Sequence, residues 1–212
     1  MSKGITTLLS LIFLFVFQLS SSLSAFAQEG EMKKMDNMQS VTGTVFCVEV
    51  DEHGMVNVKD QFDVCNGTLI VMGAEGKTYA LKGSAEETKM MMKQPGKTKS
   101  VQGVVSGHTR GWVLASASAA QPTSSENVTV TGTIVCLLPN YQAGNFQQVV
   151  ATGPCNEAQP HLHVIKTASG QVYALEGTEE SISKIESMSN RENVQLQGKI
   201  QGEQGAWVLF IQ

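Results

Sequence analysis

The sequence predicts a mainly β protein made of two copies of one small module. Residues 41–117 and 130–212 align over nearly their whole length, with matching Thr-Gly-Thr, Tyr-Ala-Leu and Trp-Val-Leu segments. Each copy also carries two cysteines at matching places, namely Cys47 and Cys65 in the first, Cys136 and Cys155 in the second. Self-similarity of this kind is the mark of a duplicated structural unit. Features that both copies keep therefore belong to the scaffold, and features of one copy are better candidates for a specialised site.

Alternating apolar residues open each copy. In the first copy the apolar positions are Val41, Val45 and Cys47, and residues 130–136 repeat the pattern. An alternation with a period of two residues is typical of a strand with one buried face. We therefore expect the first strand of each module at residues 41–47 and 130–136.

Further strand patterns follow, separated by turns that contain glycine. The expected strands are 68–72, 77–82, 101–106 and 111–116 in the first copy, and 162–167, 171–176, 194–201 and 206–211 in the second. Residues 84–87 have the capping-box pattern of a helix start, and residues 178–180 offer an equivalent cap. Ile182, Ile185 and Met188 then recur at helical spacing. We therefore expect one short helix between the third and fourth strands of each copy.

Three strands, a helix and two strands in about 80 residues resemble the oligonucleotide/oligosaccharide-binding (OB) fold, a five-stranded barrel with its helix between strands three and four. The element order is also similar to small secreted bacterial β-barrel domains of unknown function. The resemblance covers both copies and implies two tandem OB-like barrels, with a binding surface across strands two and three and the loops after strands one and four. A disulfide-linked β-sandwich is the structural alternative.

The first 27 residues have the composition of an export signal. Lys3 precedes an apolar run over residues 5–17, and residues 25–27 read Ala-Phe-Ala, the small-x-small pattern that a signal peptidase recognises. We expect cleavage before Gln28 and export to the periplasm or the extracellular space, with an uncleaved N-terminal anchor as the alternative. The apolar run is shorter than the roughly 20 residues of a membrane-spanning helix. No transmembrane segment is expected after signal cleavage.

The rest of the chain divides by composition. We expect a flexible leader at 28–40, the first module at 41–117, a linker at 118–127 and the second module at 128–212. Removal of Lys3, the only charged residue before Gln28, changes the formal net charge from −4 to −5. Because a nucleic-acid partner normally requires a basic face, this acidic chain is not expected to bind DNA or RNA.

All four cysteines follow the predicted signal. Disulfides persist in exported proteins, and four cysteines allow three pairings. The duplication favours a bridge inside each module, because a module copied whole carries its own cross-link. The predicted bridges are Cys47 with Cys65 and Cys136 with Cys155. Each would close a short loop and stabilise its module by about 3 kcal/mol in the chain-entropy model.

The predicted leader contains three methionines at a spacing of three residues, Met32, Met35 and Met38. Thioether sulfurs are soft ligands that suit Cu(I). The chain is loosely similar to periplasmic copper-handling proteins of the Cus type, which combine an OB barrel with Met-rich ligand sets. It departs from them because their His, Trp and Met barrel ligands have no identifiable counterpart here. The alternative is that these methionines have no specific role.

Two histidines distinguish the second copy from the first. His161 and His163 stand two residues apart on an expected strand, so their side chains face the same side and could jointly bind Zn²⁺ or Cu²⁺. Glu157 is near enough in sequence to supply a third ligand, and the first copy has Gly67 and Leu69 at the corresponding positions. The alternative is a pair of ordinary polar histidines, because tight structural zinc sites normally have four protein ligands.

An acidic loop distinguishes the first copy from the second. Its charged residues are Asp51, Glu52, Asp60 and Asp63. They could bind a cation or a basic partner, but they lack the spacing of an EF-hand calcium loop. Ordinary solvated charge is the alternative.

The sequence has no motif that would indicate an enzyme. It contains no Gly-x-Ser-x-Gly elbow, no His-Glu-x-x-His pair and no phosphate-binding glycine loop. We therefore expect no catalytic activity and no cofactor. The leading hypothesis is an exported binding or envelope-associated interaction protein, with an unknown protein or envelope component as its ligand. The alternative is a periplasmic handler of copper or another metal, using the Met-rich leader and the two histidines.

Overall fold

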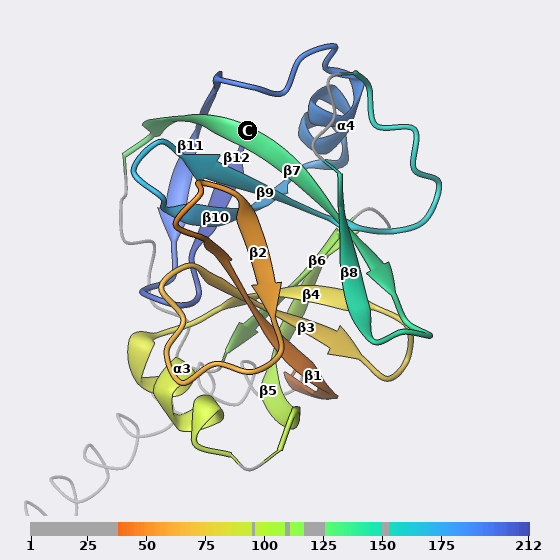
Figure 1. The fold of residues 1–212 in the computed structure, drawn as a ribbon, viewed down its shortest axis with the longest axis vertical. Helices are drawn as coiled ribbons and strands as arrows, with labels where there is room; N and C mark the ends of the chain where they lie inside the picture. The colour runs from red at the N-terminus through yellow and green to blue at the C-terminus, as the bar shows by residue number, and fades with distance from the viewer. Residues whose placement is uncertain (1–37, 95, 109–110, 117–125, 150–152) are drawn as a thin grey trace, which may run out of the picture. The chain divides into compact units, whose positions relative to one another are not determined.

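The computed structural model describes residues 38–94, 96–108, 111–116, 126–149 and 153–212. These residues form two small five-stranded mixed β-barrels in tandem, with two helices among the described residues (Figure 1). Residues 39–212 make one compact unit. The prediction of a mainly β protein with a duplicated barrel is confirmed, and the β-sandwich alternative is wrong because each sheet closes on itself.

The first barrel closes through its first and fourth strands. Its elements are β1 (Met38–Val50), β3 (Thr68–Gly73), β4 (Thr78–Lys82), α3 (Ala85–Met92), β5 (Thr98–His108) and β6 (Gly111–Ser116). The strand order is β1-β3-β4-β6-β5, and β5 pairs with β1 to complete the barrel. The β4–β6 pair is parallel, whereas β1–β3, β3–β4 and β5–β6 are antiparallel.

The second barrel repeats this topology. Its elements are β7 (Val128–Asn140), β9 (Leu162–Thr167), β10 (Val172–Gly177), α4 (Glu179–Ser187), β11 (Val194–Gln201) and β12 (Val208–Ile211). The parallel pair is β10–β12, and an antiparallel β11–β7 pair closes the barrel. The strands predicted from the alternating pattern all form, within a few residues of the expected bounds.

Each barrel also has a short extra strand that the sequence did not predict. β2 (Val56–Lys59) pairs with the end of β1, and β8 (Asn145–Val149) pairs with the end of β7. Both β1 and β7 have 13 residues, so they extend beyond the barrel and leave an edge for a hairpin partner. The side chains of β8 are exposed or half-buried, and a strand without a buried face leaves no alternating pattern in the sequence.

The helix starts follow the predicted caps. The Ser84 hydroxyl accepts from the Glu87 backbone N–H, and the Glu87 carboxylate accepts from the Ser84 N–H, which completes a capping box. In the second barrel the Thr178 hydroxyl accepts from the Ser181 N–H at 3.2 Å. Ile182 and Ile185 point into the core of that barrel, as their spacing predicted. Among the described residues, neither helix is long and apolar enough to cross a membrane.

The two barrels also share a core, which the sequence did not predict. Each barrel has its own apolar cluster, and a third cluster combines residues of β1, β3 and β4 with residues of β7, β9 and β10. The Phe46 ring meets the Phe146 ring edge-on at 5.1 Å. Four consecutive residues of β1, Val45, Phe46, Cys47 and Val48, are therefore all buried. One face of the strand packs inside its own barrel, and the other packs against the second barrel.

Candidate metal centre

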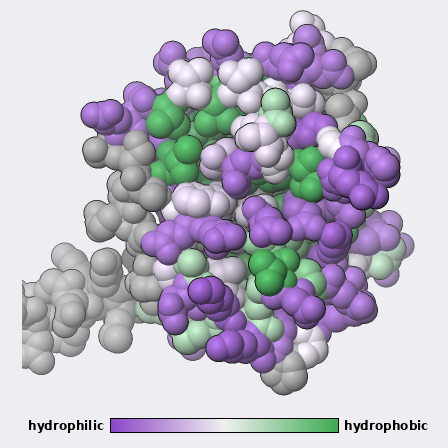
Figure 2. All heavy atoms as spheres, turned by 60° about the vertical axis from the view of Figure 1, so that its left-hand side comes forward, coloured by the Kyte–Doolittle hydropathy of each residue, from purple (hydrophilic) through white to green (hydrophobic). Residues whose placement is uncertain are grey.

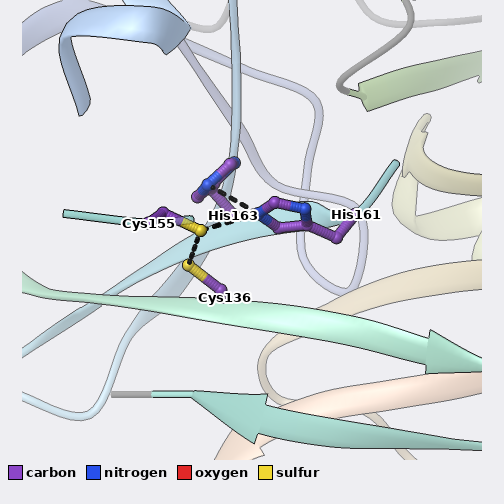
Figure 3. A group of neighbouring side chains, drawn as sticks. All are labelled: Cys136, Cys155, His161 and His163. Atoms are coloured by element: carbon purple, nitrogen blue, oxygen red, sulfur yellow. Dashed lines mark hydrogen bonds between the residues drawn. The ribbon is translucent and has the colours of Figure 1, made fainter. Parts of the chain in front are cut away.

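Four side chains of the second barrel converge at one point. They are Cys136, Cys155, His161 and His163 (Figure 3). Each offers one ligand atom, and the four atoms lie within 4.8 Å of one another. The Cys136 and Cys155 sulfurs are 3.6 Å apart, the Cys155 sulfur is 3.3 Å from His161 Nε2, and the two Nε2 atoms are 3.1 Å apart.

The barrel itself brings these residues together. Cys136 on β7 and His163 on β9 are direct partners across the antiparallel pair. His161 lies just before β9, two positions ahead of His163, and the two imidazole ring centroids are 4.6 Å apart. Cys155 lies in the irregular segment between β8 and β9, and its N–H donates to the Glu186 carbonyl of α4 at 2.6 Å. Two strands, a loop and a helix therefore fix the four ligand atoms.

Three of the six separations among the ligand atoms are close to those around a tetrahedral metal ion. Metal–sulfur bonds of about 2.3 Å and metal–nitrogen bonds of about 2.0–2.1 Å in a tetrahedron imply separations of roughly 3.8 Å for S···S, 3.6 Å for S···N and 3.3 Å for N···N. The three measured separations, 3.6, 3.3 and 3.1 Å, each fall slightly below these values and in the same order. A disulfide would need about 2.05 Å between the sulfurs.

One hydrogen bond fixes the tautomer of His161. The Gln159 carbonyl lies 2.9 Å from His161 Nδ1, and a carbonyl can only accept, so Nδ1 carries the proton and donates it. In the neutral imidazole the Nε2 atom then presents its lone pair to the cluster. This arrangement, in which the outer nitrogen binds a backbone carbonyl and the inner one faces the ion, is the usual second shell of a metal-binding histidine.

A buried arginine contacts the cluster. Arg191 Nη1 donates to the Cys136 sulfur at 2.7 Å, and Nη2 donates to the Gly153 carbonyl at 3.1 Å. The Arg191 side chain is fully buried, and its Nε has no hydrogen-bond partner among the described residues. Buried charges are normally compensated by other charges, because transfer of an isolated ion out of water is very costly. Deprotonation of the Cys136 thiol would place a compensating negative charge at this contact.

Glu186 places a carboxylate beside His163 of the cluster. Its Oε1 lies 4.0 Å from His163 Nε2, and the side chain is buried. With both cysteines as thiolates, the two sulfurs, Glu186 and Arg191 carry a formal charge of −2 in total. A divalent cation brings this buried group to neutrality, whereas a monovalent cation leaves one negative charge.

Cys136 is not arranged as a reactive nucleophile. Burial and, to a smaller extent, the neighbouring Cys155 sulfur together raise the pKa of Cys136 to about 12, because the Arg191 charge only partly offsets them. A thiol with such a pKa keeps its proton at neutral pH and is a poor nucleophile. A metal ion supplies the positive charge that displaces this proton.

The cysteines at the corresponding positions of the first barrel are bonded to each other. Cys47 and Cys65 form a disulfide, as predicted. The predicted bridge between Cys136 and Cys155 is wrong for this structure, in which both are unbonded thiols. The physical reason is their surroundings: Arg191 contacts one sulfur and His161 contacts the other. In the first barrel Leu69 lies opposite Cys47 where His163 lies opposite Cys136.

The other sequence candidates do not join this cluster. Met38 is the first residue of β1, and Met32 and Met35 lie outside the described residues. Glu157 is exposed and is absent from the group of converging ligands. The sequence therefore pointed to two of the four converging residues, and the third residue that it offered, Glu157, lies outside the group.

The acidic loop of the first barrel does not converge on one point in the described part of the chain. The Asp51 carboxylate accepts from the backbone N–H groups of His53 and Met55 and shapes the β1–β2 turn. Asp60 forms an ion pair with Lys97. These contacts match the alternative interpretation of ordinary loop charge.

Comparison with known proteins does not assign a family. No protein-family model, curated protein or solved structure matches this chain. The geometry of the described residues therefore carries the functional argument.

Proposed function

We propose that this chain is an exported, non-catalytic metal-binding protein whose second barrel holds one divalent transition-metal ion, preferably Zn²⁺. The observation that carries the proposal is the convergence of four ligand atoms within 4.8 Å, two thiols and two imidazoles, at a buried point. Such a set is rare without an ion, because four groups that prefer hydrogen-bond partners or water are buried against one another.

The ligand set favours zinc over the other common metals. Two sulfurs and two nitrogens in a tetrahedron are typical of Zn²⁺, whereas Ca²⁺ and Mg²⁺ prefer six or more oxygens. The charge of the buried group also favours a divalent over a monovalent cation. This replaces the copper(I) site in the leader as the best-supported metal hypothesis, since only His161 and His163 of the original candidates belong to the cluster.

The same ligand set argues against catalysis. Catalytic zinc ions usually have three protein ligands and keep a fourth position for water or substrate, whereas structural ions have four protein ligands. Here the protein supplies four, and Cys136, His161 and His163 are buried. A closed site of this kind binds its ion tightly and stabilises the barrel around it.

The fold supports an OB-like assignment for each barrel but not a conventional OB ligand site. The strand order, the parallel pairing of the third and fifth strands and the position of the helix all match the OB plan. OB barrels bind ligands across strands two and three, which are β3 and β4 here and β9 and β10 in the second barrel. Those strands supply residues to the core that the barrels share, so the two faces cover each other.

The disulfide of the first barrel agrees with the predicted export of the chain. A disulfide between Cys47 and Cys65 persists in an oxidising compartment, which supports the predicted signal segment. Binding to a protein or envelope partner remains the wider hypothesis from the sequence. In the view of Figure 2, hydrophobic residues form separate small groups among hydrophilic ones, and this face offers no continuous apolar surface for such a partner.

The test is a zinc titration of the full chain under anaerobic conditions, with a chromophoric zinc chelator as competitor. We expect one ion per chain. Substitution of His161 or His163 by Ala should weaken binding by more than about 100-fold, because even residues outside the metal ligands typically contribute 10- to 100-fold. His53→Ala is the matched control, since that side chain is exposed and lies 3.6 Å from the Glu52 carboxylate in the first barrel. Zinc binding that survives loss of both cluster histidines would reject the proposal.

A further inference from the structure

The equivalent cysteine pairs of the two barrels are in different chemical states. Cys47 and Cys65 are joined in the first barrel, and Cys136 and Cys155, at the corresponding positions, are thiols in the second. The backbone around each pair is alike: β1 and β7 carry the first cysteine, and each pairs with the following long strand in the same register. The scaffold can therefore accommodate a bridge at this position.

From this comparison we infer that the Cys136–Cys155 pair is a redox gate: oxidation of the two sulfurs to a disulfide releases the metal ion, and reduction restores the site. The inference rests on the proposed zinc site. The sulfurs are 3.6 Å apart, and an approach of about 1.5 Å would bring them to bonding distance. Figure 3 draws the two sulfurs next to each other, joined by a dashed line.

The exchange reaction balances with a disulfide as the oxidant. One metal-bound thiolate attacks a sulfur of an external disulfide, forms a mixed disulfide and expels one external thiolate. The second thiolate then attacks the protein sulfur of the mixed disulfide, closes the Cys136–Cys155 bond and expels the other external thiolate. The protein pair loses two electrons, the external disulfide gains them, and the metal ion loses both of its anionic ligands.

Exposure assigns the order of attack. Cys155 is partly exposed on an irregular segment, whereas Cys136 is fully buried on β7 behind the Arg191 guanidinium. A bulky external disulfide can therefore reach Cys155 first, and Cys136 acts as the resolving thiolate. The loop that carries Cys155 contains no helix or strand in its described residues 153–160, so closing the bridge would not require a helix or strand there to break.

Loss of both thiolates leaves too few ligands to retain the ion. His161 and His163 would remain, and two neutral imidazoles fall short of the four protein ligands of a tight zinc site. Glu186 lies 4.0 Å from His163 but cannot replace two anionic sulfurs alone. Oxidation should thus release zinc stoichiometrically instead of weakening its binding slightly.

The experiment treats the zinc-loaded full chain with oxidised glutathione and follows two quantities together. A chromophoric chelator reports free zinc, and peptide mapping reports which cysteines are joined. We expect one zinc ion released for each Cys136–Cys155 bridge formed, an unchanged Cys47–Cys65 bridge, and recovery of binding after mild reduction. A bridge that forms while zinc stays bound, or zinc-loaded chain that resists oxidation, would overturn the gate and leave the zinc site standing. A reduced chain that binds no zinc would overturn the zinc site and the gate together.

Two single variants test the order of attack. Cys136→Ser should trap glutathione on Cys155 as a stable mixed disulfide, because the resolving thiolate is absent. Cys155→Ser should react at least about 10-fold more slowly, because its remaining thiol is buried. If the two variants take up glutathione at equal rates, exposure does not set the order and the assigned roles are wrong. Circular dichroism of each variant shows whether its barrel is folded.

Discussion

The two barrels differ most at the place where their cysteines are most alike. Around the second pair lie His161, His163, Glu186 and Arg191, and the corresponding residues of the first barrel are Gly67, Leu69, Met92 and Lys97. Each of the four follows its counterpart by 94 positions in the sequence. Because the scaffold is shared, these neighbours explain why one pair forms a disulfide and the other lies as two unbonded thiols in a cluster with His161 and His163.

Lys97 and Arg191 show the difference most clearly. Their carbonyls make equivalent hydrogen bonds, since the Val45 N–H donates to Lys97 and the Ile134 N–H donates to Arg191. The Lys97 side chain is 52% exposed and pairs with Asp60 at the surface. Arg191 turns inward, is fully buried and donates to a cysteine sulfur. The side chain at this equivalent backbone position therefore faces solvent in the first barrel and contacts the buried cysteine cluster in the second.

Zinc binding should have the largest effect on the free energy of unfolding, and this effect should come from the second barrel alone. At a free zinc concentration of 1,000 times the dissociation constant, binding to the native state alone stabilises the chain by about 4 kcal/mol. We expect this gain in urea unfolding of the chain with reduced Cys136 and Cys155. The doubly substituted chain H161A/H163A should gain none of it. An equal gain in both chains would place the zinc site elsewhere.

Removal of the first barrel's disulfide should have the next largest effect. Simultaneous Cys47→Ser and Cys65→Ser substitution opens a bridge with a sequence separation of 18 residues. Loops of this length contribute about 3 kcal/mol in the chain-entropy model, so the unfolding midpoint in urea should fall accordingly. The matched double substitution, Cys136→Ser with Cys155→Ser, should lower the free energy of unfolding clearly less when zinc is absent. Equal costs for the two pairs would mean that the second pair is also bridged.

Arg191 should affect zinc binding without being a ligand. Arg191→Leu removes the hydrogen bond to the Cys136 sulfur and the charge that compensates the thiolates. We expect zinc affinity to fall about 10- to 100-fold, as for other residues that support metal ligands. Competition with a chelator measures the change. An unchanged affinity would show that the guanidinium serves only the packing of the barrel.

The smallest effect is expected at the equivalent position of the first barrel. Lys97→Leu removes an exposed ion pair with Asp60, and such pairs contribute little to stability. The free energy of unfolding should change by less than about 0.5 kcal/mol, and zinc affinity should stay the same. A large loss of zinc binding in this variant would contradict the assignment of the site to the second barrel.

Alternation and caps were enough to predict the barrel strands and the helix starts, because these depend on local patterns. Ser84 and Thr178 cap their helices as expected, and Ile182 and Ile185 are buried. The contact between the barrels was not predictable in this way. This contact depends on which face of β1 packs against which face of the second barrel. In the sequence, Phe46 interrupts the alternation of buried and exposed positions that predicts β1.

The site was only partly predictable for a related reason. His161 and His163 were visible because they are absent from the first copy, but the repeated cysteines looked like scaffold. Their role depends on Arg191, which lies 55 positions beyond Cys136 in sequence and contacts its sulfur only in the folded barrel. Comparison of the two copies at every position near the cysteines, instead of at the strands alone, would have flagged this residue.

X-ray absorption at the zinc edge of the zinc-loaded full chain tests the central claim most directly, because it reports the atoms bound to the ion. A second barrel closed by metal, beside a first barrel closed by a disulfide, predicts two sulfur ligands at about 2.3 Å and two nitrogen ligands at about 2.0–2.1 Å. A first shell of oxygen and nitrogen alone, or a chain that retains no zinc, would contradict the account.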